Sequence, residues 1–139
     1  MAEQRDYPLQ GWTLERVTFD FETALLFLPV SGSTPSCVVT LMGTFSVEQP
    51  GSPPLALAAG PPFAHADALL ALHREPLAQF SASSDGMLLL RFEDDRTIQA
   101  GKDSQYESWS VDGPVKLLCS PHDGPPWGLS DPNPPSIGH

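Results

Sequence analysis

The chain is short of basic residues and of cysteine, and it has no long apolar segment. Lys and Arg number 7 against 17 Asp and Glu in 139 residues, which gives a formal net charge of -10. Because like charges repel, this balance disfavours contact with nucleic-acid phosphates. The longest apolar runs, such as residues 24–30, are too short to span a bilayer. The composition therefore predicts neither a nucleic-acid partner nor a membrane partner.

The two cysteines, Cys37 and Cys119, lie in apolar strand-like segments, and the first ten residues are polar. Without an export signal, we expect a cytoplasmic protein in which both thiols are reduced and belong to the core. A disulfide between them stays open as an alternative if the fold makes them neighbours in a sheet.

Motifs for catalysis, metal binding and phosphate binding are missing. A metal site on a helix needs ligands three or four residues apart, whereas His65 stands two residues from Asp67 and eight from His73. There is no Gly-x-Ser-x-Gly elbow, Cys-x-x-Cys pair, calcium loop or glycine-rich phosphate loop. The sequence predicts a protein that is not an enzyme and that uses neither a metal nor another cofactor.

Alternating and apolar segments predict mostly β structure. A phase slip at Glu15 and Arg16 predicts a bulge, Gly43 predicts a bend, and Asp85-Gly86 is a strong hairpin signal. We expect an α+β fold, mainly an antiparallel curved sheet or partial barrel of about seven strands with one short helix packed on it. The expected strands cover residues 12–21, 24–30, 37–47, 77–83, 87–92, 97–100, 106–111 and 115–119.

Proline is abundant and unevenly placed. Eleven of the 16 prolines lie in residues 49–62 or after residue 120. Since proline fixes φ and removes a donor, residues 49–62 are predicted to form a loop, and the Ala- and Leu-rich residues 63–74 a helix. We expect a flexible N-terminus over 1–10, a single β-rich domain over 11–127 and a disordered tail over 128–139.

Acidic and aromatic residues gather in the second half of the chain. In a strand over residues 106–111, Glu107 and Trp109 share one face. Either Trp109 anchors the edge of the core and Glu107 is satisfied there, or the two belong to a recognition patch. The second interpretation predicts a partner-binding face that comprises Tyr106, Glu107, Trp109, Glu93, Asp94, Asp95 and Asp103.

Three segments share a pattern with a known family. Residues 86–92 read G-x-L-x-L-x-F, residues 106–109 read Y-E-x-W, and residues 117–121 precede Gly124 and Trp127. Together they resemble an uncharacterised bacterial domain family that is frequent in actinomycetes, over residues 11–127. The Y-E-x-W element is also similar to segments of immunity proteins from polymorphic toxin systems. The resemblance implies no catalytic residue.

Charge and pattern together predict a non-enzymatic protein-binding module, such as an immunity-type inhibitor whose acidic-aromatic face covers a basic cleft. A basic protein partner fits the charge of -10, although solubility alone also explains it. One alternative is a small-molecule-binding accessory protein with an apolar pocket in a half-barrel. Another is an enzyme that uses carboxylates such as Asp20 and Glu22. A homodimer is compatible with an unpaired strand edge.

Overall fold

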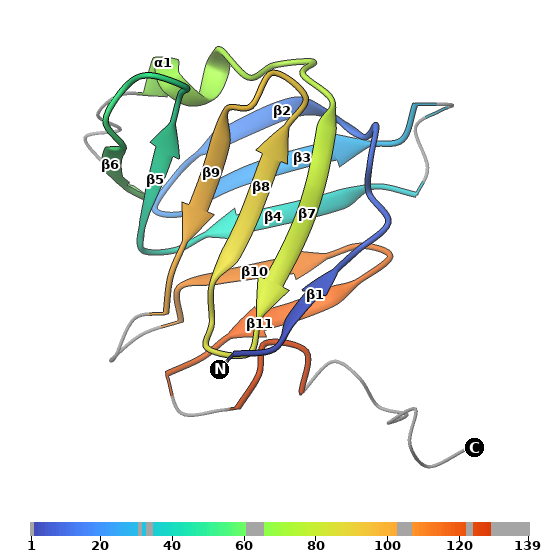
Figure 1. Cartoon of the computed structure of the whole chain (residues 1–139), viewed down its shortest axis with the longest axis vertical. Helices are drawn as coiled ribbons and strands as arrows, with labels where there is room; N and C mark the ends of the chain where they lie inside the picture. The colour runs from blue at the N-terminus through green and yellow to red at the C-terminus, as the bar shows by residue number, and fades with distance from the viewer. Residues whose placement is uncertain are drawn as a thin grey trace.

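Two antiparallel β-sheets pack face to face, with strands that cross at a steep angle (Figure 1). The computed structural model describes residues 2–30, 32, 35–60, 66–102, 107–121 and 124–128. The elements in chain order are β1 (Gln4–Asp6), β2 (Thr13–Phe19), β3 (Thr23–Leu28), β4 (Cys37–Leu41), β5 (Thr44–Glu48), β6 (Leu55–Ala58), α1 (Ala66–Leu70), β7 (Leu77–Ser83), β8 (Leu88–Phe92), β9 (Thr97–Ala100), β10 (Trp109–Asp112) and β11 (Lys116–Cys119).

One sheet, called sheet A, has the order β1-β7-β8-β9-β5-β6, and the other, sheet B, has the order β11-β10-β4-β3-β2. The helix α1 lies at one end of the sandwich (Figure 1). The prediction of a mostly antiparallel protein with one short helix is confirmed. The expected number and arrangement of strands are wrong, because the described residues form eleven strands in two sheets and no closed barrel.

The segment 37–47, predicted as one bent strand, crosses from one sheet to the other. Its first part, β4, pairs with β3 and β10 in sheet B, and its second part, β5, pairs with β6 and β9 in sheet A. Met42 and Gly43 separate the two strands. A glycine in an apolar run therefore marks a corner between two packed layers, which a periodicity of two does not distinguish from a bend.

The bulge predicted in the first strand is confirmed. Leu14 pairs with Phe27 and Arg16 pairs with Leu26, so the register between β2 and β3 shifts at Glu15. The extra residue lets Leu14 enter the core while Arg16 faces solvent.

Two edge strands form in segments where no strand was expected. Residues 4–6, assigned to the flexible N-terminus, form β1 and pair with β7. Residues 55–58, assigned to the proline-rich loop, form β6 and pair with β5. Both lie at the edges of sheet A, where one side of the strand needs no partner and where preceding prolines such as Pro54 are tolerated.

The predicted helix is shorter than residues 63–74. Its α-helical part is Ala66–Leu70, and residues 71–74 continue as turns that end at Arg74 with a φ of +68°. Leu69 and Leu72 are buried, so this segment closes one end of the core. Residues 61–65 lie outside the described residues, as does the predicted tail over 128–139 apart from Gly128.

The core lies between the inner faces of sheets A and B, and Trp109 connects the two sheets there. The indole of Trp109 is fully buried, and its Nε1 donates a hydrogen bond of 2.9 Å to the carbonyl oxygen of Gly86. Gly86 sits in the β7–β8 hairpin of sheet A, whereas Trp109 begins β10 of sheet B. The bond therefore joins the two sheets and satisfies the one polar group of a large buried side chain.

Replacement of Gly86 by alanine should destabilise the protein more than the same replacement at Gly51, a glycine with a similar φ. Gly86 has a φ of +95°, and an added Cβ would lie 2.7 Å from the Cβ of Lys102 and 3.1 Å from the Sγ of Cys119. We expect Gly86→Ala to lower the free energy of unfolding by about 3 kcal/mol, because strain and overlap combine. The matched control Gly51→Ala, with a φ of +79° and open space around it, should cost about 1 kcal/mol. Chemical denaturation measures both, and equal losses would contradict the overlap.

Candidate functional site

The structure does not bring the predicted partner-binding residues together. Glu93, Asp94 and Asp95 lie in the β8–β9 turn, whereas Glu107 comes after the far end of β9 and two residues before β10. The two groups are therefore at opposite ends of sheet A. The other predicted contacts, Tyr106 and Asp103, lie outside the described residues.

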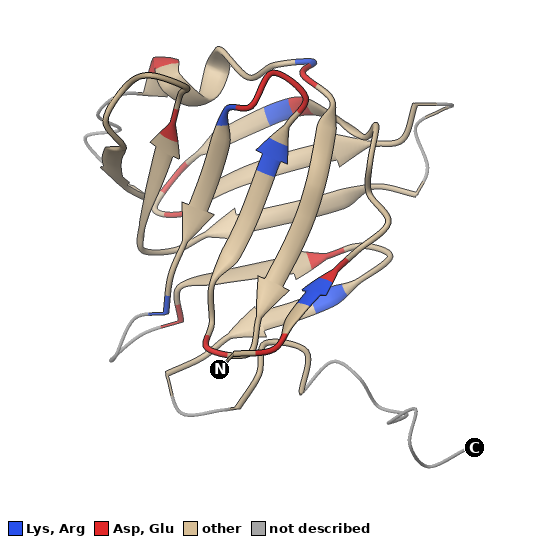
Figure 2. Cartoon of the chain, viewed as in Figure 1, with Lys and Arg blue, Asp and Glu red and all other residues tan. Residues whose placement is uncertain are grey.

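The acidic β8–β9 turn is accompanied by arginines (Figure 2). Asp94 forms an ion pair of 2.6 Å with Arg96, and Asp95 one of 3.3 Å with Arg91. Arg96 also approaches Glu75 at 4.0 Å. Two of the three turn carboxylates are thus compensated locally, and the turn presents less negative charge to a partner than its sequence suggests.

Trp109 is a core residue, which is one of the two roles that its sequence context left open. Its side chain is 0% exposed and packs between the sheets, so it offers no surface to a partner. Glu107 is exposed and lies outside the strand. The described residues therefore do not form the predicted acidic-aromatic face. Strand alternation alone could not reveal this, because it does not say which face of β10 meets the second sheet.

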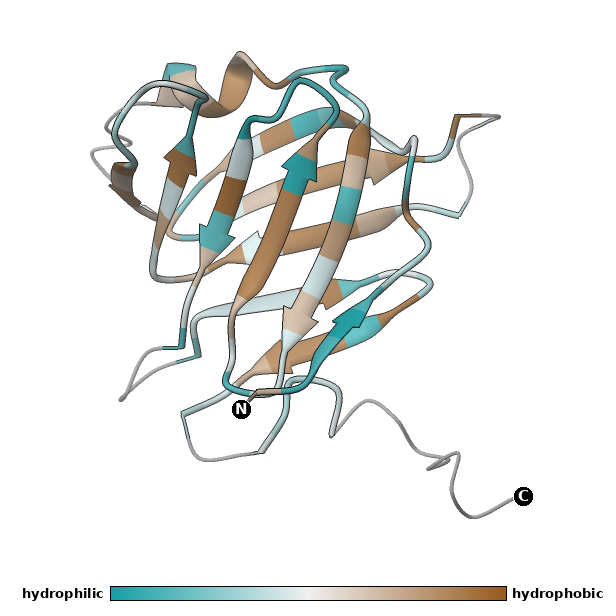
Figure 3. Ribbon diagram, in the orientation of Figure 1, coloured by the Kyte–Doolittle hydropathy of each residue, from teal (hydrophilic) through white to brown (hydrophobic). Residues whose placement is uncertain are grey.

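The outer faces of the two sheets differ in polarity. On sheet A, the outward residues are mostly polar, as expected for an antiparallel sheet that faces water. On sheet B the outward centre is apolar, and hydrophobic residues follow β3 and β4 along most of their length (Figure 3). We call this surface the β3 face and define it by the partly exposed residues Ala24, Leu26, Leu28, Val38 and Leu118. The corresponding outward positions on sheet A are Ser46, Glu48, Gln79, Arg91, Thr97 and Gln99, together with the apolar Leu89 and with Ser81, which is buried.

The apolar stripe continues past both ends of β3. Phe21, directly before the strand, is 79% exposed, and Val30, directly after it, is 81% exposed. A surface hollow of about 450 Å³ adjoins Phe21, and another of about 360 Å³ adjoins Val30. Single exposed apolar side chains are ordinary on protein surfaces, whereas an aligned group such as this one is a candidate interaction surface.

The β2–β3 turn holds Phe21 between two carboxylates. The backbone N–H of Phe21 donates to Oδ1 of Asp20 at 2.9 Å, and the N–H of Asp20 donates to the carbonyl of Glu22 at 3.0 Å. Gly60 packs against the turn so closely that an added Cβ would lie 3.0 Å from the Phe21 oxygen. Neither carboxylate forms an ion pair within the described part of the chain. This Asp20-Phe21-Glu22 turn is an ordered, acidic-aromatic projection.

Sequence reasoning missed the Asp20-Phe21-Glu22 turn because Phe21 continues the alternation of Val17 and Phe19, which predicts a buried strand residue. The strand instead ends at Phe19. The available signal was the pair of flanking carboxylates, which are poor strand formers and good turn formers.

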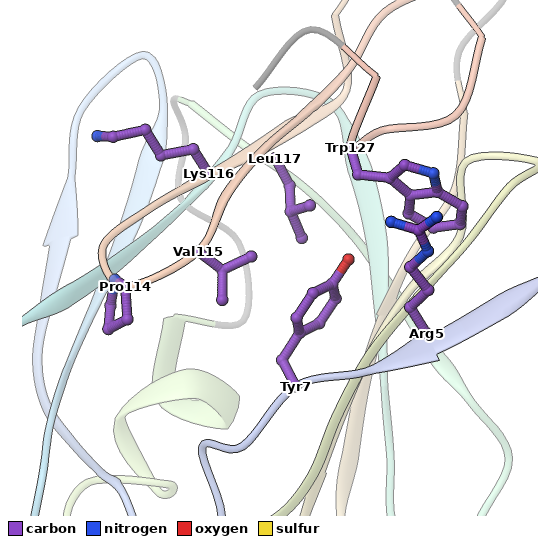
Figure 4. Close-up of a pocket in the computed structure, with 7 residues that line it drawn as sticks. All are labelled: Arg5, Tyr7, Pro114, Val115, Lys116, Leu117 and Trp127. Carbon is purple, nitrogen blue, oxygen red and sulfur yellow. The ribbon is translucent and has the colours of Figure 1, made fainter. Parts of the chain in front are cut away.

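A notch opens between the edges of the two sheets (Figure 4). Its volume is about 230 Å³, and the guanidinium of Arg5 lies 4.0 Å above the ring of Trp127 at its rim. Arg5 also forms an ion pair of 3.0 Å with Glu3. Sites for small molecules usually enclose about 300–1,000 Å³, so this notch is small for a metabolite. Its lining residues are Arg5, Tyr7, Pro114, Val115, Lys116, Leu117 and Trp127.

Both thiols are free and buried. Cys37 pairs with Phe27 and Cys119 with Trp109, so the two cysteines are not neighbours. Burial raises the pKa of Cys37 to about 12, with a smaller contribution from the Asp112 carboxylate, and burial also raises the pKa of Cys119. Since the thiolate is the nucleophile and the metal ligand, neither side chain is prepared for such chemistry.

Within the described residues, no group of three or more His, Cys, Asp and Glu side chains could hold a metal ion. No helix in this part of the chain is long and apolar enough to cross a membrane.

The thiols should be silent in the native protein. We expect no reaction of Cys37 or Cys119 with an aromatic disulfide reagent near neutral pH, and complete reaction of both in denaturant. Because folding raises the pKa of Cys37 from 9.0 to about 12, its contribution to stability is present below pH 9 and is lost as the pH rises toward 12. Cys37→Ser should flatten that alkaline decline, and rapid native labelling at neutral pH would contradict the burial.

The comparisons with known proteins concern the whole sandwich. A model described as a family of unknown function, DUF6188, matches residues 6–124. No curated protein and no solved structure matches the chain. The matched range runs from the end of β1 to beyond β11 and includes both sheets, the β3 face and the Asp20-Phe21-Glu22 turn. The chain therefore belongs to the DUF6188 family, whose function is unknown.

Proposed function

We propose that this protein is a non-enzymatic protein-binding module that contacts a basic partner through the Asp20-Phe21-Glu22 turn. The observation that carries the proposal is the exposure of Phe21, at 79%, between two carboxylates without a described cationic partner. The proposal keeps the type of partner expected from the charge of -10 and moves the contact from the β10 segment to the β2–β3 turn.

The two components of the turn have different tasks in binding. An aromatic ring that is exposed in the free protein releases water when it enters a partner's pocket, and such anchors dominate the affinity of interfaces. Carboxylates at the rim mainly accelerate association with a basic surface and reject acidic surfaces. The hydrogen bonds within the turn and the contact with Gly60 reduce the conformational entropy that binding would remove.

The shape of the turn supports an inhibitor that enters a cleft. It projects from the end of β2 and β3, and the hollow of about 450 Å³ beside Phe21 has room for a partner side chain. Its lining includes Asp20, Glu22 and Thr40, which suit the head and stem of a lysine or an arginine. An immunity-type inhibitor that covers a basic active site is the form of the proposal that uses all of these features.

The alternatives have less support from the geometry. A carboxylate enzyme would need Asp20 and Glu22 in a site that excludes water, whereas both lie on an exposed turn. The small-molecule alternative needs an enclosed apolar pocket, whereas the notch of about 230 Å³ between β1 and β11 and the hollows of about 450 and 360 Å³ beside β3 are all open to solvent, and the notch has an ion-paired arginine at its rim.

The turn can be tested by affinity capture from the native host followed by titration of the captured protein. We expect Phe21→Ala to raise the dissociation constant by about 30-fold or more, in the range of an aromatic hot spot. The double variant Asp20→Asn with Glu22→Gln should mainly slow association and weaken its dependence on salt.

Val30→Ala, at the other end of β3, is the matched apolar control, and Glu107→Gln tests the segment first predicted from the sequence. Both should bind like the original chain. Capture of a basic protein that is indifferent to Phe21, or a dominant effect of Glu107, would reject the turn as the contact.

A further inference from the structure

We infer that the β3 face is a homodimer interface, on which a second copy docks so that Arg16 of each copy meets Asp112 of the other. The inference is argued from the face of sheet B and not from the Asp20-Phe21-Glu22 turn, although the hollow beside Phe21 is lined in part by the same face, at Thr18, Ala24 and Thr40. Its starting point is one row of side chains that crosses the sheet.

The row follows from the strand register. Arg16 pairs with Leu26, Leu26 with Val38, and Val38 with Asp112. All four side chains point away from the core, because their strand neighbours Val17, Leu25, Val39 and Val111 point inward. Across the sheet, the row therefore reads basic, apolar, apolar, acidic.

The two charged members of this row cannot reach each other within one chain. They stand on β2 and β10, three strand spacings or about 14 Å apart. Arg16 is the only arginine among the described residues that makes no ion pair with any of them, since Arg5, Arg74, Arg91 and Arg96 are all paired. It is nevertheless placed beside an apolar stripe, where a second molecule could supply a carboxylate.

A two-fold axis between two copies brings Arg16 of each copy next to Asp112 of the other. Let the axis lie between the two molecules, parallel to the strands and above the gap between β3 and β4. Then β2 of one copy faces β10 of the other, and β3 of one copy faces β4 of the other. Arg16 then stands opposite Asp112 of the second copy, and Leu26 stands opposite Val38. Such an interface is isologous, so each charge pair and each apolar contact occurs twice.

The next row agrees with the same axis. Its outward members are Thr18, Ala24, Thr40 and Ser110, again on β2, β3, β4 and β10. The operation places Thr18 opposite Ser110 and Ala24 opposite Thr40, so neither row brings like charges together. Asp112 also contacts Lys116 on β11, an exposed pair at the rim that can remain in place.

The size of the face fits a weak dimer. The four facing strands β2, β3, β4 and β10 span about 14 Å, and the six residues of β3 span about 20 Å. This footprint is smaller than the roughly 800 Å² per partner of a standard interface, so the paired charges and not the area select a second copy as the occupant. On the outer face of sheet A, Leu89 is an apolar residue with polar neighbours on both sides, which favours sheet B as the docking face.

The dimer has a consequence for the projecting turn. Because the axis is parallel to the strands, it preserves their direction, so the Asp20-Phe21-Glu22 turns of both copies lie at the same end. The assembly then places both turns, with two phenylalanines and four carboxylates, at the same end of the interface. Because the hollow beside each Phe21 is lined in part by Thr18, Ala24 and Thr40, a second copy and a basic partner would compete for it.

Charge exchange on the purified full-length chain tests the inference. Sedimentation equilibrium of the original protein should show a mass that rises with concentration from 15.0 kDa toward twice that value. Arg16→Asp and Asp112→Arg should each raise the dimer dissociation constant at least about tenfold, because like charges then face each other. An equimolar mixture of the two variants should dimerise again, since both charge pairs are complementary in the mixed dimer.

The chain that carries both exchanges should also recover the dimer. Leu26→Ser tests the apolar centre and should weaken dimerisation, whereas Gln99→Asp, on the outer face of sheet A, should leave the mass unchanged. Thermal unfolding followed by circular dichroism shows that each variant is folded. A mass of 15.0 kDa at every concentration, or single exchanges that dimerise like the original protein, would overturn the inference. Failure of the mixture to recover would reject the Arg16–Asp112 pairing.

Discussion

The contact between Trp109 and Gly86 is the constraint on which the two-sheet arrangement depends. The indole belongs to β10 of sheet B, and the carbonyl that accepts its hydrogen bond belongs to the β7–β8 hairpin of sheet A. The Sγ of Cys119 approaches the same carbonyl at 3.6 Å, and the positive φ of Gly86 lets the hairpin come this close. Gly86 opens the G-x-L-x-L-x-F pattern and Trp109 closes the Y-E-x-W pattern, so the segments that carry the family resemblance meet at one point of the core.

Because Trp109 is buried, it contributes to the architecture of the sandwich and not to its surface chemistry. An aromatic side chain that bridges the sheets contributes packing and one satisfied hydrogen bond, and it cannot also serve as an exposed anchor. The acidic residues that surround it in sequence are dispersed in space, and those of the β8–β9 turn are largely compensated by Arg91 and Arg96. The buried tryptophan and the ion-paired turn therefore do not form one binding surface.

The asymmetry between the outer faces is the main surface property of the fold. Sheet A faces outward with serine, threonine, glutamine and charged side chains, whereas sheet B presents an apolar stripe with Phe21 and Val30 at its ends. In a sandwich, each sheet needs only one apolar face, the one that meets the other sheet. A second apolar face is exposed to water, which is unfavourable, and a partner that covers it would remove this exposure. The Asp20-Phe21-Glu22 turn and the row from Arg16 to Asp112 give that surface charge as well as hydrophobicity.

Local patterns in the sequence determined the local structure. The bulge at Glu15, the Asp85-Gly86 hairpin and the strands over residues 77–83 and 97–100 follow from alternation and turn chemistry, which involve neighbours in the chain. The reduced thiols of Cys37 and Cys119 were also foreseeable from their apolar surroundings. Tertiary structure alone decided that residues 37–47 divide between two sheets, that 4–6 and 55–58 add edge strands, and that Trp109 is buried while Phe21 is exposed. A period of two identifies the faces of a strand, but which face meets another sheet depends on contacts between segments far apart in the chain.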